Sequence, residues 1–481
     1  MENVAKFRDY LEENRDRHVG RIRDFVSYPT VSTENEQSIE ACAKWLVDCY
    51  KQLGCKEAEL VETKGLPGVW AYLNAGAQKT ICNYGNFDVA PVVDESKWDS
   101  PPFAGKLTKK VPFGQVMVGR GAMSHKGPYM AWLNALEALI AVEGKLPVNV
   151  MFLVEGEEVP GSLHYREMFD RYKNKLKNAD ACFSPGVSQD SNGNVQLTLG
   201  FKTFIQLEME ASGSAWGRGP KGSLVHGMAK SVVDSPVWRL VHAMSSLTAK
   251  DGNKVRIKDF YSDFPPPSDV ERGHVAELRK QLGDKRWQQV LRGVGDDVKQ
   301  PIDDCSEEEV FLRYFYGASF NINGLKSGYI GPGTETFTIP HEASCLFDIR
   351  LPRGSRADKT IERLRKHLDS HGYQDIQLKV IGAYDSCQAD PNSELVKAIQ
   401  GVFKTQGVSV IVWPCSGGGG PWALYQSELG MPVIQGVGLG FGGNVGGPNE
   451  YLVIEGDGKV GGLIDTELSH IQMLTAYASP K

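Results

Sequence analysis

The sequence predicts an α/β fold in which a layered domain with much parallel strand pairing is interrupted by a smaller inserted α+β domain. Short apolar segments alternate with helix-like segments up to about residue 200, which favours parallel strands covered by helices. The pattern changes near Phe201, and the first pattern returns after residue 384. The chain has 481 residues, more than a single hydrophobic core usually holds. The expected domains are therefore 1–200 and 385–481 for the main domain and 201–384 for the insertion.

The first part of the main domain predicts two helices within residues 1–60, followed by alternating strands and helices. The second helix has one apolar face with three- and four-residue spacing and ends at Gly54. That face consists of Ile39, Cys42, Leu46, Cys49 and Leu53. Val148–Val154 is apolar except for Asn149, which suits a strand buried on both faces. The other expected elements are strands at Val69–Leu73, Thr80–Tyr84 and Ala179–Ser184, and a helix at Gly127–Val142.

The insertion and the last part of the chain are predicted from the same patterns. Strands are expected in the insertion at Thr203–Ala211, Tyr314–Asn323, Ser344–Leu351 and Ile376–Gly382, and helices at Leu224–Thr248 and Lys359–Ser370. After residue 384 we expect a helix at Ser393–Thr405, a strand at Val408–Trp413 and a final helix at Gly462–Tyr477.

Composition excludes several classes of protein. The formal net charge is -6, so no broad basic surface for nucleic acid or an anionic membrane is expected. No apolar run is long enough to span a membrane, and the charged N-terminus is unlike a secretory signal. The nine cysteines form no Cys-x-x-Cys pair and are expected to be reduced thiols. The sequence therefore predicts a soluble cytoplasmic protein.

Four segments with unusual residues follow predicted strands or open a helix. Ligands bind at the carboxyl ends of strands in open α/β sheets, so these segments are candidates for a functional site. They cover residues 83–91, 119–128, 155–162 and 436–450. The last is glycine-rich and could be a backbone nest for an anion or a series of tight turns.

Several titratable side chains in or near these segments allow both a functional and a structural interpretation. Glu155, Glu157 and Glu158 follow the buried strand directly, and carboxylates this close repel one another. At least one should have a raised pKa or meet a cation, unless the loop is simply solvated. His125 could be a general acid–base or a helix cap. Cys415 could be a nucleophile or a small core residue.

Together these segments resemble the M20 family of metallopeptidases, in particular its cytosolic dipeptidase branch. Residues 85–91 are similar to the family's Gly-His-x-Asp-Val-x-Pro, and residues 119–128 to its Gly-Arg-Gly-x-x-Asp-Asp-Lys-Gly-Pro. Residues 155–162 are similar to its Glu-Gly-x-Glu-Glu-Ser-Gly-Ser. The resemblance covers nearly the whole chain. It implies a catalytic domain with a mixed, largely parallel sheet flanked by helices, and an inserted α+β lid or dimerisation domain.

The resemblance also implies two zinc-like ions, and this sequence departs from the family at their ligands. The family uses two His, a bridging Asp, a Glu and a second Asp, which hold the ions that polarise a carbonyl and activate water. Asn86 stands at the first His, Ser124 at the bridging Asp and Pro185 at the second Asp. The final His falls on Gly446 or a neighbour.

The remaining ligand depends on how residues 155–162 are aligned. Without a gap, Glu158 takes the place of the family's general base and Val159 replaces the ligand Glu. If the loop is slipped by one residue, Glu157 is the base and Glu158 the ligand. Amide, hydroxyl and glycine cannot replace carboxylate and imidazole around two dications. We therefore expect no binuclear metal site and no cofactor.

Other family positions imply how a substrate is held. Arg350 matches the lid arginine that binds a substrate carboxylate, whereas Asn323 replaces a lid histidine. Asp88 matches the residue that orients a metal-bound His and could here serve a neighbouring side chain or the substrate. The residues expected to contact the substrate are Arg350, Asn86, Asn323, Gly417, Gly418 and Gly446.

The leading hypothesis is an enzyme that works without metal on a small carboxylate-bearing substrate of the amino-acid or dipeptide type. Glu158, or Glu157, would form an acid–base pair with His125, and amides of the glycine-rich tail could stabilise an oxyanion. Such groups suit hydrolysis, isomerisation, elimination or acyl transfer. In a variant of this hypothesis, Ser124 is the nucleophile and His125 is its base.

Two alternatives remain open. One is a catalytically inactive pseudoenzyme that acts in binding or assembly, since loss of all ligands would also follow loss of activity. The other is a dipeptidase or amidohydrolase with a rebuilt metal site. The resemblance further implies a homodimer formed through the inserted domain.

Overall fold

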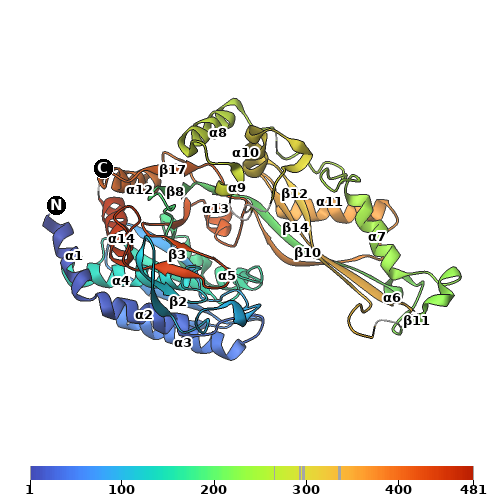
Figure 1. Cartoon of the computed structure of the whole chain (residues 1–481), viewed down its shortest axis with the longest axis horizontal. Helices are drawn as coiled ribbons and strands as arrows, with labels where there is room; N and C mark the ends of the chain where they lie inside the picture. Colours follow the sequence, from blue (N-terminus) through green and yellow to red (C-terminus); the bar gives the residue numbers. More distant parts are fainter. Residues whose placement is uncertain (1, 265, 292–293, 295–297, 334–336, 480–481) are drawn as a thin grey trace. The chain divides into compact units, whose positions relative to one another are not determined.

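A computed structural model of the chain describes residues 2–264, 266–291, 294, 298–333 and 337–479. The chain forms two compact units (Figure 1). It begins in unit 1, continues through most of unit 2, and then returns to unit 1. Unit 1 comprises Met1–Gly200, Gln388–Trp413 and Leu424–Lys481. Unit 2 comprises Phe201–Cys387 and Pro414–Ala423. No helix among the described residues has the length and apolarity needed to cross a membrane.

The centre of unit 1 is a six-stranded sheet with the order β1-β2-β6-β3-β7-β18. Its strands are β1 (Glu57–Val61), β2 (Gly68–Leu73), β3 (Thr80–Asn86), β6 (Asn149–Glu155), β7 (Ala181–Pro185) and β18 (Val433–Val437). The pairs β3–β6, β3–β7 and β7–β18 are parallel, whereas β1–β2 and β2–β6 are antiparallel. Every residue of β3 and β6 is buried, as expected for central strands covered on both faces. The predicted fold class, with a mixed and largely parallel sheet, is confirmed.

Helices cover this sheet on both sides, with α4 and α14 packed against each other (Figure 1). They are α1 (Glu2–Glu13), α2 (Arg15–Ser27), α3 (Glu36–Leu53), α4 (Lys126–Glu143), α5 (Tyr165–Leu176), α12 (Glu394–Thr405), α13 (Ala423–Leu429) and α14 (Leu463–Ala478). The start of the chain forms three helices rather than the two predicted, because the backbone departs from helical geometry at Asn14. Two smaller sheets complete the unit, with orders β19-β20-β5-β4 and β17-β8. Their strands are β4 (Lys106–Lys110), β5 (Gly114–Val118), β8 (Val195–Thr198), β17 (Val410–Trp413), β19 (Gly442–Gly443) and β20 (Tyr451–Val453).

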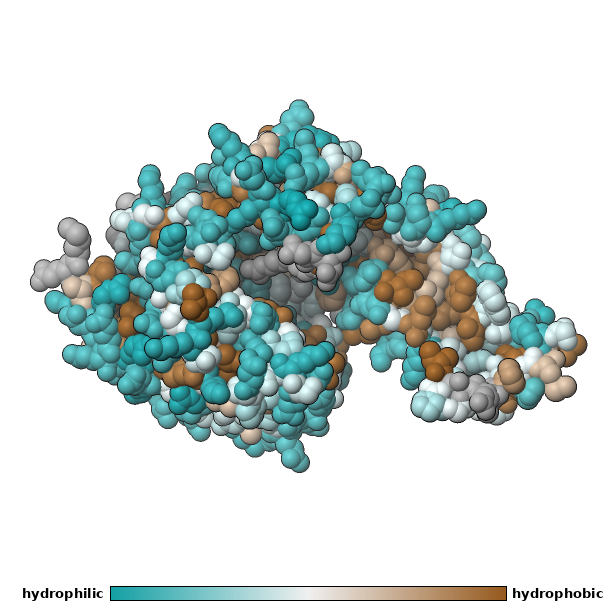
Figure 2. Space-filling view, viewed as in Figure 1, coloured by the Kyte–Doolittle hydropathy of each residue, from teal (hydrophilic) through white to brown (hydrophobic). Residues whose placement is uncertain are grey.

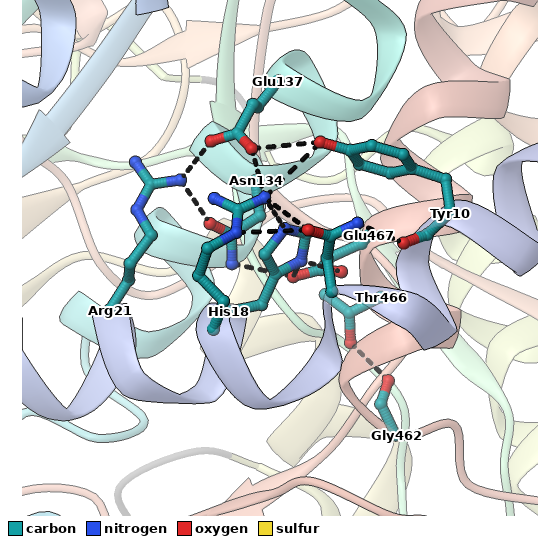
Figure 3. Close-up of polar contacts among 10 residues, drawn as sticks. Tyr10, His18, Arg21, Asn134, Glu137, Gly462, Thr466 and Glu467 are labelled. Atoms are coloured by element: carbon teal, nitrogen blue, oxygen red, sulfur yellow. Dashed lines mark hydrogen bonds and ion pairs between the residues drawn. The ribbon is translucent and has the colours of Figure 1, made fainter. Parts of the chain in front are cut away.

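A buried polar network joins three of these helices (Figure 3). His18 Nδ1 on α2 lies 3.0 Å from an oxygen of Glu467 on α14, and Asn134 on α4 donates to the same carboxylate at 2.8 Å. Arg21 extends the network by donating to Asn134 and to Glu137, each at 2.8 Å. Because burial raises the pKa of Glu467, these donors are needed to hold its charge inside the unit. The network fixes α2 against α4 and α14.

Unit 2 contains an antiparallel sheet with the order β12-β14-β10-β15. Its strands are β10 (Thr203–Ser212), β12 (Ser319–Ser327), β14 (Glu342–Leu351) and β15 (Gln377–Tyr384). Helices α7 (Pro236–Leu247) and α11 (Ala357–Ser370) run along one face (Figure 1). Alternate residues of β10 and β14 are buried under them, and the residues between are only partly covered. The opposite face therefore presents polar side chains.

The remaining elements of unit 2 differ from the prediction. They are α6 (Gly213–Trp216), β11 (Val225–His226), α8 (Asp269–Leu282), α9 (Trp287–Val290), α10 (Glu307–Tyr316) and β13 (Thr338–Ile339). The predicted helix Leu224–Thr248 is helical in α7 and otherwise contains β11 and a short 3-10 helix at Gly227–Ser231. The predicted strand Tyr314–Asn323 begins only at Ser319, because Ser306 caps a helix that continues to Tyr316.

Candidate functional site

Asp88 lies just beyond the carboxyl end of β3 and is fully buried. Its carboxylate accepts hydrogen bonds from Ser32 Oγ at 3.1 Å and Asn86 Nδ2 at 3.2 Å. It also accepts from the backbone amides of Glu158 at 3.1 Å and Val159 at 2.9 Å. Burial raises the pKa of Asp88, although these four donors favour its charged form. Asp88 therefore holds the loop that follows β6 at a fixed distance from β3.

Glu158 is the third residue after β6 and begins the turn that follows this strand, and its side chain is half-buried. Burial, and then the nearby charge of Asp88, raise the pKa of Glu158 to about 7. A carboxyl group with this pKa exists in both protonation states near neutral pH. It can therefore give or take a proton without a large energetic penalty.

Glu157 has a different environment from its neighbour. Its carboxylate accepts a hydrogen bond from Nδ1 of His164 at 2.7 Å, and its side chain is only 8% exposed. Glu157 is thus hydrogen-bonded to His164, whereas Glu158 is held beside Asp88. The sequence analysis missed the pairing of His164 because the two residues are seven positions apart and an irregular loop joins them.

Glu155, at the end of β6, is the third carboxyl of this segment and is buried. Tyr84 donates its hydroxyl to Glu155 Oε1 at 2.7 Å, and Ser162 donates to the same oxygen at 2.9 Å. Burial raises the pKa of Glu155 well above its ordinary value. Burial thus disfavours the charged form of Glu155, and the hydroxyls of Tyr84 and Ser162 satisfy its Oε1.

The segment that carries Ser124 is fixed by a second buried ion pair. Arg120 Nη1 lies 2.8 Å from Glu450, and both side chains are almost completely buried. The other oxygen of Glu450 accepts from the backbone amides of Met123 at 3.1 Å and Ser124 at 2.9 Å. Arg120 also donates to the carbonyl oxygen of Gly446 at 3.0 Å. The pair thus joins the second predicted segment to the glycine-rich tail.

His125 immediately precedes α4, and its side chain is half-buried. Its carbonyl oxygen accepts from the amide of Tyr129 in the first turn of the helix. The next residue, Lys126, is buried and donates to the carbonyl oxygens of Phe25 at 3.1 Å and Tyr28 at 2.6 Å. Burial lowers the pKa of Lys126 to about 8. Lys126 therefore anchors the start of α4 to the end of α2.

In unit 2, Arg350 lies on the polar face of the sheet. Its guanidinium is 4.3 Å from the ring centre of Phe204 on the neighbouring strand, and its Nε donates to Asp348 at 2.9 Å. Asn321 also donates to Asp348, at 3.2 Å, and the Asn323 amide reaches the same carboxylate at 2.8 Å when its nitrogen faces it. Arg350 and Asn323 are thus brought together by Asp348, which the sequence analysis did not single out.

The glycines that follow Cys415 form a loop in the same unit. Gly418 donates its amide to Ser416 Oγ at 3.1 Å and accepts from the amide of Lys202 at 2.9 Å. Gly417 lies beside the ring of Tyr314. Cys415 is buried, and burial raises the pKa of its thiol to about 12. A thiol in this state is a core residue and a poor nucleophile.

The positions where the resemblance implies metal ligands carry a different donor set. The Asn86 amide donates to Asp88, and Ser124 has a hydroxyl in place of a carboxylate. Pro185 and Gly446 have no side-chain donor atom. Among the residues that the structure describes, no three His, Cys, Asp or Glu side chains form a group that could hold a metal ion. These residues do not fit two dications, because few anionic oxygens or imidazoles remain to replace the hydration of the ions.

Comparisons with known proteins agree on one family. The chain is 24% identical over 454 residues to the Cys-Gly metallodipeptidase DUG1 of Candida albicans, covering 89% of this chain and 88% of that protein. It is 24% identical over 384 residues to the human Beta-Ala-His dipeptidase, covering 76% and 71% of the two chains.

Solved structures show the same relationship. The M20 family metallo-carboxypeptidase Sso-CP2 from Sulfolobus solfataricus superimposes with a TM-score of 0.78 at 27% identity, over 96% of this chain and 98% of that chain. At the level of sequence, the family model of Peptidase family M20/M25/M40 matches residues 82–461, which is most of the chain. The chain therefore belongs to Peptidase family M20/M25/M40.

Proposed function

We propose that this member of the family performs metal-independent acid–base chemistry on a small, carboxylate-bearing substrate of the amino-acid or dipeptide type. Glu158 carries the proposal, because it stands at the position of the family's general base and has a pKa near 7. In a site with two bound dications, a carboxyl at this place would be held in its charged form. Without them, Glu158 can act as the proton acceptor and donor at neutral pH.

The donor set supports a metal-free mechanism. Asn86 and Ser124 replace an imidazole and a carboxylate, and Asn86 is already bound to Asp88. Asp88 accepts from the backbone amides of Glu158 and Val159, and so positions the loop of Glu158. His125 is the second titratable group that we assign to the site, as the partner that returns or removes a proton. Ser124 remains the alternative nucleophile.

Arg350 is the group that we assign to the substrate carboxylate. The hydrogen bond from Nε to Asp348 and the stacking on Phe204 fix the plane of the guanidinium. The two Nη atoms take no part in the bond to Asp348, and their spacing matches that of two carboxylate oxygens. Asn323, Gly417 and Gly418 are assigned to the same substrate-binding role.

The proposal is tested with purified full-length protein that has been treated with EDTA and dialysed. It is incubated with dipeptides, N-acyl amino acids and free amino acids, and products are followed by mass spectrometry. We expect turnover that EDTA does not remove, that falls about 100-fold or more in Glu158→Gln, and that is unchanged in the control Cys415→Ser. Full activity of Glu158→Gln would contradict the assignment. Turnover that EDTA abolishes and zinc restores would favour a rebuilt metal site, and no turnover with any substrate would favour a pseudoenzyme.

We further propose that the protein is a homodimer that pairs through unit 2. β12 is an edge strand of its sheet, and most of its residues are exposed, so its backbone groups can pair with a second copy. Apolar side chains also gather on this unit (Figure 2). The large exposed ones include Leu224, Met228, Val232, Trp238, Val241, Ile322, Leu325, Tyr329, Ile330 and Phe337. Light scattering should give twice the mass of the chain, and Leu325→Asp should give the monomer; a monomeric wild type would contradict this.

A cytoplasmic location is proposed from the cysteines. All nine are free thiols, and all except Cys305 are buried, as expected for a protein that folds in a reducing compartment. Fractionation of cells that produce the protein would test this, and recovery from a secreted or membrane fraction would contradict it.

A further inference from the structure

The turn that carries Glu158 is held by side chains on both sides of that residue. On one side, Asp88 accepts from the amides of Glu158 and Val159. On the other, the carboxylate of Glu157 is bound to His164. We infer that Glu157 and His164 form a positioning pair, which fixes the peptide that precedes Glu158 and so keeps Glu158 beside Asp88. The inference rests on the proposed role of Glu158.

The pair is short and largely shielded from solvent on the Glu157 side. Nδ1 of His164 lies 2.7 Å from Glu157 Oε2, with side-chain exposures of 26% and 8%. A nearby surface pair, Lys64 with Glu167, is longer at 3.8 Å and has exposures of 84% and 37%. An exposed pair of that kind contributes little, whereas loss of one partner from a buried pair leaves the other without its counter-charge or hydrogen bond.

The pair connects the turn to a rigid element. His164 immediately precedes α5, whose residues Met168 and Phe169 are buried in unit 1. The backbone closes the turn between them, because the amide of Ser162 donates to the carbonyl oxygen of Glu157 at 2.7 Å. Displacement of His164 would therefore release the part of the turn that Asp88 does not hold.

Gly65 gives independent evidence that the pair is closely packed. A β-carbon at Gly65 would overlap the ring of His164 and would lie 2.6 Å from Glu157 Oε1. The chain before β2 thus passes directly over the pair, at a distance that only glycine permits. Gly65→Ala should consequently disturb the pair without changing either of its residues.

The inference is tested by amide hydrogen exchange, which does not require a known substrate. In wild type, the amides of Glu158 and Val159 should be protected because they donate to Asp88. We expect their exchange to become about tenfold faster or more in His164→Leu and in Gly65→Ala. His164→Asn should restore protection, because its amide nitrogen can donate to Glu157 from nearly the position of Nδ1.

Gly20→Ala is the matched control for Gly65→Ala, because a β-carbon at Gly20 meets no atom within 4 Å. Its exchange pattern at Glu158 and Val159 should equal that of wild type. If His164→Leu does not fold, the inference is tested by comparing the exchange of the two amides in Gly65→Ala with that in Gly20→Ala. Unchanged protection of both amides in the folded variants would overturn the inference. A wild type without turnover would refute the proposed function but would leave this measurement intact.

Discussion

The pKa of Glu158 leads to a prediction about stability that needs no substrate. This pKa is about 7 in the folded protein, against an ordinary value of 4.5. The folded state therefore binds the proton more tightly than the unfolded chain. The stability that follows from the bound proton is fully present below about pH 4.5 and is lost as the pH rises through 7. Above that pH, the charged Glu158 destabilises the fold.

The isosteric change Glu158→Gln removes this cost. The difference between 4.5 and about 7 corresponds to at most about 3.5 kcal/mol, since one pH unit is worth about 1.4 kcal/mol. Because the side chain is half-buried and keeps some water, we expect a gain of about 1 to 2 kcal/mol at pH 8.5 and none at pH 4.5. The variant should therefore be the more stable protein at high pH, although it should lack activity.

Urea unfolding at several pH values measures this difference. Trp70 and Trp132 are fully buried in unit 1 and report its unfolding by fluorescence. Glu157→Gln is the matched control in the same turn, because it removes the neighbouring carboxylate, which contacts His164, and leaves Glu158 in place. If wild type and Glu158→Gln have the same pH dependence, Glu158 does not lie in the environment described above.

Three further predictions concern other parts of the candidate site. Asp88→Ala should lower the free energy of unfolding of unit 1, measured in urea, by about 3 kcal/mol or more, because four donors lose a buried acceptor. A decrease below about 1 kcal/mol would contradict this. Arg350→Lys should raise KM about tenfold or more with little change in kcat, because lysine has no planar fork that binds Asp348 and a substrate carboxylate together. A fall in kcat without a change in KM would contradict the role of Arg350 in substrate binding. Cys415 should resist iodoacetamide at pH 8 in the native protein, because burial raises the pKa of its thiol to about 12, and rapid labelling detected by mass spectrometry would disprove its burial.

The layered fold of unit 1 could be predicted because its strands carry a simple pattern. Val148–Val154 was expected as a doubly buried strand, and β6 occupies Asn149–Glu155. The helix with one apolar face before Gly54 is α3. In both places one local pattern, a continuous apolar run or a helical repeat, agrees with the tertiary burial.

Unit 2 was predicted less well, because local propensity there competes with loops and caps. The helix expected from Leu224 begins only at Pro236, since Val225 and His226 pair with β13 and Gly227–Ser231 forms a short 3-10 helix. Tyr314 has high strand propensity, but it belongs to a helix that starts at the Ser306 cap and continues through a buried face.

At the candidate site, family motifs identified the residues but not their partners. Glu157 and Glu158 are adjacent in sequence and could not be ranked by pattern alone. Glu157 contacts His164, seven positions along the chain, whereas Glu158 lies beside Asp88, 70 positions before it. Such contacts depend on side-chain direction, which the sequence does not specify.

The most direct test of the central claim is the metal content of untagged protein. The protein is exposed to excess zinc, manganese and cobalt, desalted, and analysed by mass spectrometry. We predict less than about a tenth of an equivalent of any metal, because the donor set does not replace the hydration of a dication. One or two tightly held equivalents would contradict the account and would make metal-dependent hydrolysis the leading function.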